Sequence, residues 1–190
     1  MTNVTIFGSG NMGSAIAGVL ASGGASVQHV GRDETATLTG DVVVLAVPYP
    51  SVADIVATYA DQLAGKIVVD ITNPLNFETF DSLVVPAGSS AAAEIARALP
   101  QSHVLKAFST NFAATLASGT VGTNRTTVLV AGDDEASKQT LVAAVTAGGL
   151  DAVDAGSLAR AHELEAIGFL QLTLAAREAV SWTAGFALVR

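Results

Sequence analysis

Gly8, Gly10 and Gly13 form the pattern Gly-x-Gly-x-x-Gly, whose residue types and spacing suit the binding of a phosphate group. The pattern follows an apolar run at residues 4–7 and opens a segment with apolar residues at helical spacing. In such a strand–turn–helix unit the first glycine makes the tight turn, the second lets the backbone approach a pyrophosphate, and the third lets helix and strand pack closely. The helix N-terminus adds free N–H groups and a positive dipole end. The spacing therefore predicts a dinucleotide-binding turn.

The residues after the second predicted strand indicate which dinucleotide is bound. NAD-specific domains place Asp or Glu about twenty residues beyond the turn, where the carboxylate binds the ribose 2′-hydroxyl. Here Gly31 stands at the strand end and Arg32 follows. A small residue removes the carboxylate that would repel a 2′-phosphate, and an arginine pairs with that phosphate by charge-assisted hydrogen bonds. The pattern favours NADP over NAD, while Asp33 keeps open the alternative that a carboxylate binds the ribose instead.

No side chains in the sequence have the spacing of a catalytic or metal-binding motif. The chain has no cysteine, and its three histidines, His29, His103 and His162, lie far apart along the sequence. There is no Ser-His-Asp arrangement and no pair of carboxylates in a recognised motif. We therefore expect neither a catalytic side chain nor a metal site.

Composition narrows the classes of partner and location. Half of the 190 residues are hydrophobic and 14% are charged, which is typical of a folded domain. A net charge of -8, with only nine Lys and Arg, argues against nucleic acid or an anionic membrane as a partner. The longest apolar run near the C-terminus, residues 166–176, is too short to span a bilayer, and the N-terminus lacks the basic start of a signal peptide. We expect a cytoplasmic enzyme.

Short runs rich in Val and Ile alternate with helix-like segments along the chain. This alternation is typical of α/β proteins with a doubly wound, mostly parallel sheet, and we expect a single Rossmann-like NADP-binding domain over residues 1–190. About ten residues join the second and third strands, too few for a helical crossover, so the helix there is expected to shrink to a turn or disappear. Residues 72–88 are expected to form a functional loop. The predicted strands are 4–7, 26–30, 41–47, 66–71, 103–109, 126–132 and 150–156, and the predicted helices are 11–22, 51–64, 89–99, 134–147 and a helical extension from about 158.

Ordered segments over nearly the whole chain resemble one known family. The opening GSGNMGSAIAG is similar to that of pyrroline-5-carboxylate reductase, but nothing further along resembles that enzyme's long helical domain. The later segments are similar, in order, to the NADPH-dependent reductases of the deazaflavin coenzyme F420, whose relatives include the reductase domain of ferric-reducing membrane proteins. The segments that carry this resemblance are DVVVLAVPYPSVADIV, KIVVDITNPLN, SSAAAEIARALPQSHVLKAFSTNFAATLASG, VLVAGDDEASKQTLVAAV and LDAVDAGSLARAHELEAIGFLQLTL.

The resemblance implies a hydride transfer between C4 of the nicotinamide and C5 of a deazaflavin stacked against it, without a general base. The acceptor ring would lie between the loops of the site and the C-terminal helix. Tyr49 stands where this family often has tryptophan, and the last ten residues match its pocket-closing segment only loosely. The phosphate and ribose contacts that the resemblance implies are Ser9, Gly10, Asn11, Met12, Gly31 and Arg32. The residues that it implies beside the nicotinamide are Ala46, Val47, Pro48, Tyr49, Asn73, Pro74, Leu75 and those from Ala107 to Thr110, including Ser109.

Two further expectations concern the hydride acceptor and the oligomeric state. F420 is the first choice of acceptor because uncharged hydrogen-bonding groups among small residues suit a flat ring, and the only cation near these motifs is Lys106. The alternatives are an NADPH-dependent flavin or ferric reductase, an imine reductase similar to pyrroline-5-carboxylate reductase, and a non-enzymatic NADPH-binding sensor module. The segment 158–180 is apolar on most sides, which predicts that it is buried in a homodimer and helps to form the acceptor pocket.

Overall fold

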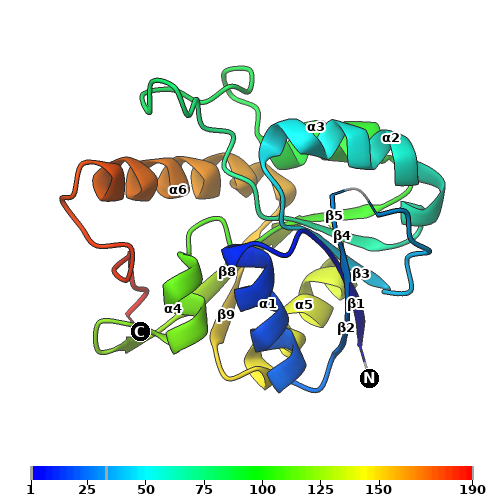
Figure 1. The fold of residues 1–190 in the computed structure, drawn as a ribbon, viewed down its shortest axis with the longest axis horizontal. Coiled ribbons are helices and arrows are strands. Elements are labelled where there is room, and N and C mark those ends of the chain that lie inside the picture. The colour runs from blue at the N-terminus through cyan, green and yellow to red at the C-terminus, as the bar shows by residue number, and fades with distance from the viewer. Residues whose placement is uncertain (1, 33, 190) are drawn as a thin grey trace.

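The computed structural model describes residues 2–32 and 34–189, and within these residues seven strands form one sheet in the order β2-β1-β3-β4-β5-β8-β9. Each of the seven predicted strands is present. The apolar runs of β1, β3, β4, β5 and β8 are buried because helices cover both faces of the sheet, while the edge strands β2 and β9 are mostly half-buried (Figure 1). The strands are β1 (Asn3–Phe7), β2 (Ser26–Val30), β3 (Val42–Leu45), β4 (Ile67–Asp70), β5 (His103–Lys106), β8 (Thr127–Gly132) and β9 (Asp151–Gly156).

The helices lie in two layers, one on each face of the sheet (Figure 1). The layer below the sheet in Figure 1 contains α1 (Asn11–Ser22), α4 (Ala113–Ser118) and α5 (Glu135–Ala147). The layer above it contains α2 (Val52–Leu63), α3 (Ala91–Ala98) and α6 (Ala161–Ala176). Short 3-10 turns, η1 (Tyr49–Ser51) and η2 (Leu158–Arg160), precede α2 and α6.

The strand order places a ligand crevice at the carboxyl ends of β1 and β3. Strands β1 to β5 pair in parallel, β8 pairs antiparallel with β5, and β9 pairs in parallel with β8. From β1 the chain first adds β2 on one side and then returns to add β3 on the other side. This reversal is the topological switch point at which open α/β sheets bind ligands. The mostly parallel Rossmann-like sheet that the sequence predicts is confirmed.

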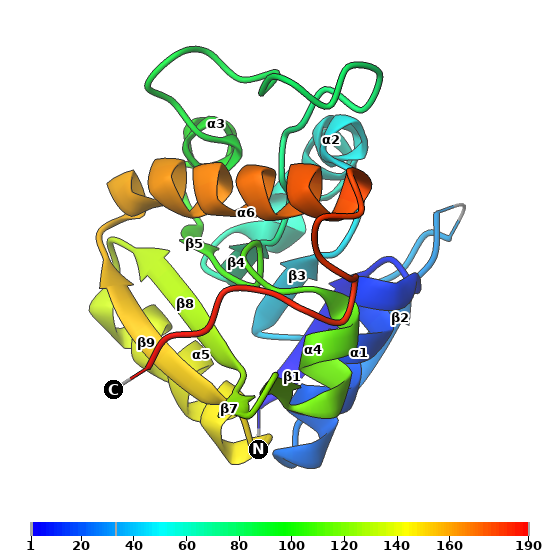
Figure 2. The ribbon, with the colours of Figure 1, turned by 90° about the vertical axis from the view of Figure 1, so that its left-hand side faces the viewer.

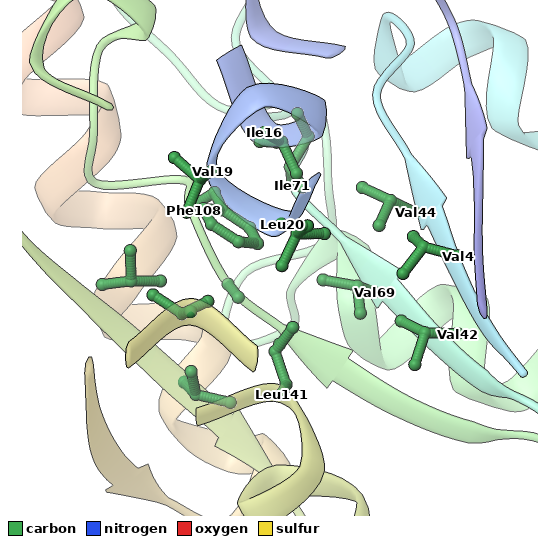
Figure 3. Close-up of a cluster of buried hydrophobic side chains, with 14 of the residues drawn as sticks. Val4, Ile16, Val19, Leu20, Val42, Val44, Val69, Ile71, Phe108 and Leu141 are labelled. Carbon is green, nitrogen blue, oxygen red and sulfur yellow. The ribbon is translucent and has the colours of Figure 1, made fainter. Parts of the chain in front are cut away.

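Helix α1 is held against the sheet by a cluster of buried aliphatic side chains (Figure 3). Its residues Ile16, Val19 and Leu20 pack with Val4 of β1 and Val44 of β3, and all five are nearly or completely buried. Burying each such side chain stabilises the fold by about 1.5–3 kcal/mol. A second cluster, built around Tyr59, Leu63 and Ile95, joins α2 and α3 to the opposite face of the sheet. The first cluster fixes the N-terminus of α1 relative to the strand ends.

The connection between β2 and β3 and the segment 72–88 both lack a helix, as the sequence predicts. Residues 34–41, which join β2 to β3, contain no helix. The amide of Gln28 donates to Thr37 O at 3.1 Å, and Leu38 N donates to Gln62 Oε1 at 2.9 Å, so side chains of β2 and α2 hold the link in place. Residues 72–88 form an irregular loop with one antiparallel bridge between Leu75 and Leu83.

The structure contains three short elements that the sequence does not predict. They are α4 and a hairpin of β6 (Thr120–Val121) and β7 (Asn124–Arg125), where the sequence analysis expects no regular structure. The predicted extension from residue 158 begins as expected with η2 and α6, but the helix ends at Ala176 and residues 177–189 form a non-helical tail. Among the described residues, we find no helix with the length and apolar character needed to cross a membrane.

Candidate functional site

The turn between β1 and α1 has the geometry that its glycines predict. Gly8 has φ 99°, and a Cβ there would overlap the carbonyl oxygen of Ala46 at the end of β3. A Cβ on Gly13 would overlap the carbonyl oxygen of Gly8. Around Gly10, by contrast, no atom of the described chain lies within 4 Å of a Cβ position. Gly8 and Gly13 thus bring strand, turn and helix together, while Gly10 leaves open space at the helix N-terminus.

The N-terminus of α1 is available to an anion. Gly10 is the N-cap residue, so no side chain accepts hydrogen bonds from the first N–H groups of the helix, and the first turn contains no acidic residue. Uncapped N–H groups and the helix dipole together favour a bound phosphate. The open space over Gly10 and these donors fit the pyrophosphate of a dinucleotide.

A cleft of about 610 Å³ extends from this turn along the carboxyl ends of β1, β2 and β3. We call it the glycine-turn cleft. Most of the predicted phosphate and ribose contacts, namely Ser9, Gly10, Gly31 and Arg32, lie in its wall. The wall also includes residues of α2. Its lining is Phe7, Gly8, Ser9, Gly10, Val30, Gly31, Arg32, Glu34, Thr35, Ala46, Val47, Pro48, Ser51, Asp54, Ile55, Thr58 and Tyr59.

The charged residues at the end of β2 have opposite signs. Arg32 and Glu34 both line the glycine-turn cleft and both are exposed. The carboxylate of Glu34 accepts a hydrogen bond from Gly31 N at 2.8 Å. Asp33, the alternative ribose ligand of the sequence analysis, lies outside the described residues. The end of the glycine-turn cleft at β2 therefore contains a cation, which would attract a phosphate, and a carboxylate, which would repel one.

A second cavity of about 390 Å³ begins at Asn11 and Met12, directly after the glycine turn. We call it the α6 cavity because α6 forms one of its walls. The ends of β4 and β5, helix α4 and the tail provide the others. Its lining is Asn11, Met12, Ile71, Asn73, Phe108, Ser109, Asn111, Phe112, Ala113, Ala114, Gly168, Gln171, Leu172 and Trp182, and none of these described residues has an ionisable side chain.

Several polar atoms at the α6 cavity have no hydrogen-bond partner in the described part of the chain. Asn73 donates through Nδ2 to Ser109 O at 2.9 Å, and Asn111 donates through Nδ2 to Thr127 O at 3.1 Å. The side-chain oxygens of Asn73, Ser109 and Asn111 are buried and unpartnered. Leaving such a group unpaired costs about 1–3 kcal/mol. These oxygens therefore lie just beneath the cavity surface with unused hydrogen-bonding capacity.

Helix α6 approaches the floor of its cavity through Gly168. A Cβ at Gly168 would overlap Asn73 Oδ1 and the carbonyl oxygen of Ser109, so only glycine allows the helix to lie directly on these two segments. Phe108, which precedes Ser109, is completely buried with φ 61°. A bulky residue in this left-handed conformation costs about 1–3 kcal/mol and is concentrated at functional sites. Ser109 and Asn111, which follow this strained turn, line the cavity.

A buried ionic cluster lies behind the cavity wall. The ammonium group of Lys106 lies 2.7 Å from Asp70 Oδ2 and 2.8 Å from Glu165 Oε1, and it also donates to the carbonyl of Thr72. Asp70 Oδ1 accepts from Thr72 N at 2.9 Å. Burial raises the pKa of Glu165, an effect that the Lys106 charge opposes. Lys106 is completely buried, so this cation fixes the start of the 72–88 loop and anchors α6 instead of entering the cavity.

Glu165 also connects α6 to α3, its neighbour in the same helix layer. Its Oε2 accepts a hydrogen bond from Ala91 N at 2.9 Å, which satisfies a free donor at the N-terminus of α3. Tyr49, at the start of η1, lies in the field of this acidic region. Burial, followed by the charges of Glu94, Glu165 and Asp70, raises the pKa of the Tyr49 hydroxyl. Tyr49 therefore remains a neutral hydroxyl at ordinary pH.

The C-terminal tail supplies an aromatic wall to the α6 cavity. Figure 2 shows the tail leaving the end of α6 and turning back toward α4. Trp182 packs on Phe112 with ring centroids 5.1 Å apart, and Phe186 N donates to Gln171 Oε1 at 3.1 Å. Trp182 lines the cavity and retains 54% of its surface exposed. A flat ligand in the cavity would have an indole face within reach.

The structure brings thirteen of the nineteen predicted site residues to the walls of the two cavities. Of the other six, Gly13 packs against the turn and Ala107 is completely buried. In the glycine-turn cleft the predicted residues are Gly8, Ser9, Gly10, Gly31, Arg32, Ala46, Val47 and Pro48, and in the α6 cavity they are Asn11, Met12, Asn73, Phe108 and Ser109. Those that line neither cavity are Gly13, Tyr49, Pro74, Leu75, Ala107 and Thr110.

Sequence reasoning missed several lining residues. Glu34 lies directly after Asp33, the acid predicted as the alternative ribose ligand, and carries the same kind of signal. Gly168 lies in the middle of α6, and an isolated glycine in a helix often marks a close packing contact. The contribution of Phe112 and Trp182 had no local signal, because their pairing depends on how the tail folds back.

The reversal of strand order, the glycine turn and the open cleft beside it define a dinucleotide-binding domain of the Rossmann type. A family model described as NADP oxidoreductase, coenzyme F420-dependent, matches residues 24–74. The F420-dependent NADP reductase of Methanocaldococcus jannaschii is 31% identical over 140 residues, which are 72% of this chain and 62% of that protein. Together with the structural similarity below, these matches support assigning the chain to the family of F420-dependent NADP oxidoreductases.

Two further relatives extend the comparison. Metalloreductase STEAP3 of Rattus norvegicus is 37% identical over 145 residues, which are 75% of this chain and 28% of that protein. The crystal structure of a candidate F420-dependent NADP reductase from Arthrobacter sp. FB24 has 26% sequence identity and a TM-score of 0.84, and the match covers 100% of both chains. The chain spans less than two thirds of the length of the two curated relatives.

Proposed function

We propose that the protein transfers a hydride between NADP(H) and a flat, flavin-like acceptor, with the deazaflavin F420 as the first candidate. The observation that carries this proposal is the α6 cavity, which opens directly beside the phosphate-binding turn and whose described lining has hydrogen-bonding groups but no ionisable side chain. When both ligands are bound, a hydride passes between C4 of the nicotinamide and C5 of the deazaflavin, and one proton is exchanged with water.

We assign the glycine-turn cleft to the adenosine half of the coenzyme and the α6 cavity to its nicotinamide half. Gly10 belongs to the lining of the first and Asn11 to that of the second. A pyrophosphate at the N-terminus of α1 would direct its adenosine toward Arg32 and its nicotinamide toward Asn73 and Ser109. In this assignment the residues from Ala46 to Pro48, which the resemblance implies beside the nicotinamide, line the adenosine side.

The neutral α6 cavity favours a ring acceptor over an imine. Reduction of an imine requires a proton donor close to the substrate nitrogen, and the described lining provides amides, a hydroxyl, small residues and aromatic rings. Hydride exchange between two cofactors needs only that their rings are aligned. Phe112 and Trp182 offer stacking surfaces for such a ring.

A flavin or ferric-chelate reductase is the second candidate, and the similarity to rat STEAP3, a metalloreductase by name, supports it. An isoalloxazine ring and a deazaflavin ring present similar flat surfaces, so the same cavity suits both. A pure NADPH sensor is less well supported, because that role requires no second cavity beside the nicotinamide. The cytoplasmic location expected from the sequence stays a prediction.

We also propose that the chain forms a homodimer through α6 and the segments beside it. Ile167 and Leu170 of α6 are 37% and 51% exposed, and Phe77 and Val84 of the 72–88 loop are also exposed. Exposed apolar side chains in one region are typical of an interaction surface. The apolar character of segment 158–180 that predicted pairing is thus retained on the outer side of α6.

An anaerobic acceptor screen tests the proposed function. NADPH oxidation would be followed with F420, FMN, FAD, a ferric chelate and pyrroline-5-carboxylate, each at the same concentration. The proposal predicts turnover with F420 or a flavin and none with the pyrroline. Turnover of pyrroline-5-carboxylate alone would contradict it, and coenzyme binding without oxidation by any acceptor would favour a sensor.

A further inference from the structure

Glu34 forms a closed hydrogen-bonded turn with Gly31 at the carboxyl end of β2. Its Oε2 accepts a hydrogen bond from Gly31 N at 2.8 Å, and its own N–H donates to Gly31 O at 3.3 Å. The Glu34 side chain is exposed and lines the glycine-turn cleft together with Arg32. An anion belonging to the chain itself therefore occupies a backbone donor inside the cleft.

The carboxylate of Glu34 fills the space beside Gly31. A Cβ on Gly31 would lie 3.2 Å from Glu34 Cδ and 3.3 Å from Oε2, tighter than most real Cβ contacts. The absence of a side chain at Gly31 thus makes room for a carboxylate from three residues further along the chain. Gly31 has no side chain, and Glu34 instead places a carboxylate at the end of the strand.

We propose that Glu34 is a specificity-determining residue that lowers the preference for NADP(H) over NAD(H), an inference that rests on the proposed coenzyme site. The 2′-phosphate of NADP(H) has the same sign of charge as the Glu34 carboxylate and competes with it for the Gly31 N–H. The 2′-hydroxyl of NAD(H) instead donates a hydrogen bond to that carboxylate. Arg32 attracts the 2′-phosphate and therefore acts in the opposite direction to Glu34.

The surrounding segment allows the carboxylate to move when a phosphate enters. Glu34 is exposed, and residues 34–41 form no helix that would hold its backbone. Displacing the side chain costs one exposed hydrogen bond and brings its charge into water. The expected effect on coenzyme choice is therefore moderate, and NADP(H) binding is weakened but not abolished.

The test compares Glu34→Gln with the unmodified protein by calorimetric titration of NADPH and of NADH at one ionic strength. Glutamine retains an oxygen that accepts from Gly31 N–H, so the substitution removes the charge with little change in shape. Removing a unit charge about 4 Å from a phosphate in water is expected to tighten NADPH binding about fivefold. NADH binding is expected to stay the same or weaken, so the ratio of the two affinities shifts toward NADPH.

Asp61→Asn is the matched control, because Asp61 is an exposed acid of α2 outside the glycine-turn cleft and its replacement changes the net charge equally. Its NADPH-to-NADH affinity ratio is expected to remain within twofold of the unmodified ratio. Thermal unfolding of both variants verifies that they are folded. If Glu34→Gln binds both coenzymes with an unchanged ratio, or if Asp61→Asn shifts the ratio as much, the role of Glu34 is refuted while the proposed function stands. If the unmodified protein binds neither coenzyme, both are refuted.

Discussion

Replacing Gly10 with alanine is expected to abolish coenzyme binding while the protein remains folded. Gly10 has φ -70° and ψ -175°, an extended conformation that alanine adopts without strain. No atom of the described residues lies within 4 Å of the new Cβ. A glycine-to-alanine change at such a position stabilises a protein by about 0.4–1 kcal/mol, because it restricts the unfolded chain.

The loss of binding follows from where the methyl group lies. It would occupy the open space over the uncapped N-terminus of α1, where we place the pyrophosphate. A hydrogen bond to a charged group contributes about 1.5–3 kcal/mol, and a phosphate pushed away from the turn would lose at least two of them. A loss of about 3 kcal/mol corresponds to an affinity lower by at least about a hundredfold.

The assay combines calorimetric titration of NADPH with thermal unfolding of the same samples. Gly18→Ala is the matched control, because Gly18 is an exposed residue of the same helix and likewise has no described neighbour within 4 Å of a Cβ position. That variant is expected to be more stable by up to about 1 kcal/mol and to bind NADPH normally. Should Gly10→Ala bind NADPH within threefold of the unmodified protein, the placement of the pyrophosphate would be wrong.

Three further predictions concern charge, pH and assembly. Arg32→Ala is expected to weaken NADPH binding by about 1.5–3 kcal/mol and leave NADH binding nearly unchanged; equal losses for both coenzymes would contradict the role of Arg32. The hydrogen bond with Lys138 lowers the pKa of Asp154, and the same bond raises the pKa of Lys138. The pair therefore stabilises the fold at pH values above the pKa that the carboxyl group has in the unfolded chain and below the pKa that the ammonium group has there. Asp154→Asn is therefore expected to lower the melting temperature at pH 7, and the difference from the unmodified protein is expected to shrink as the pH falls below about 4. A difference in melting temperature that does not change with pH would contradict this assignment. Leu170→Asp is expected to yield a monomer in light scattering at micromolar concentration, where the unmodified chain is expected to be a dimer; a monomeric unmodified chain would refute the proposed homodimer.

The sequence predicted those features whose signals are local. Strands β1, β3, β4 and β8 are short runs rich in Val, Ile and Thr, and the glycine turn carries its geometry in three positions. The missing crossover helix followed from counting about ten residues between two strands. The elements that were missed, α4 and the β6–β7 hairpin, contain only six and two residues per element, too few to display a period.

The α6 cavity could not be predicted because its walls come from distant parts of the chain. Residues 11–12, 71–73, 108–114 and 168–182 meet there only after the sheet, the strained turn at Phe108 and the close approach at Gly168 are in place. Whether an oxygen of Asn73 or Asn111 is unpartnered depends on hydrogen bonds made by the other end of the same amide. The resemblance identified Asn73 and Ser109, but the cavity that they share is a property of the folded chain.

The central claim is that the α6 cavity aligns a nicotinamide and a flat acceptor for direct hydride transfer. An anaerobic single-turnover reaction of F420 with NADPH that carries deuterium at the transferred C4 position tests it most directly. Our account predicts that the deuterium appears at C5 of the reduced deazaflavin without exchange with water, and that the transfer step shows a primary isotope effect. Binding of NADPH with no deuterium transferred to F420, and with no reduction of FMN, would contradict this account.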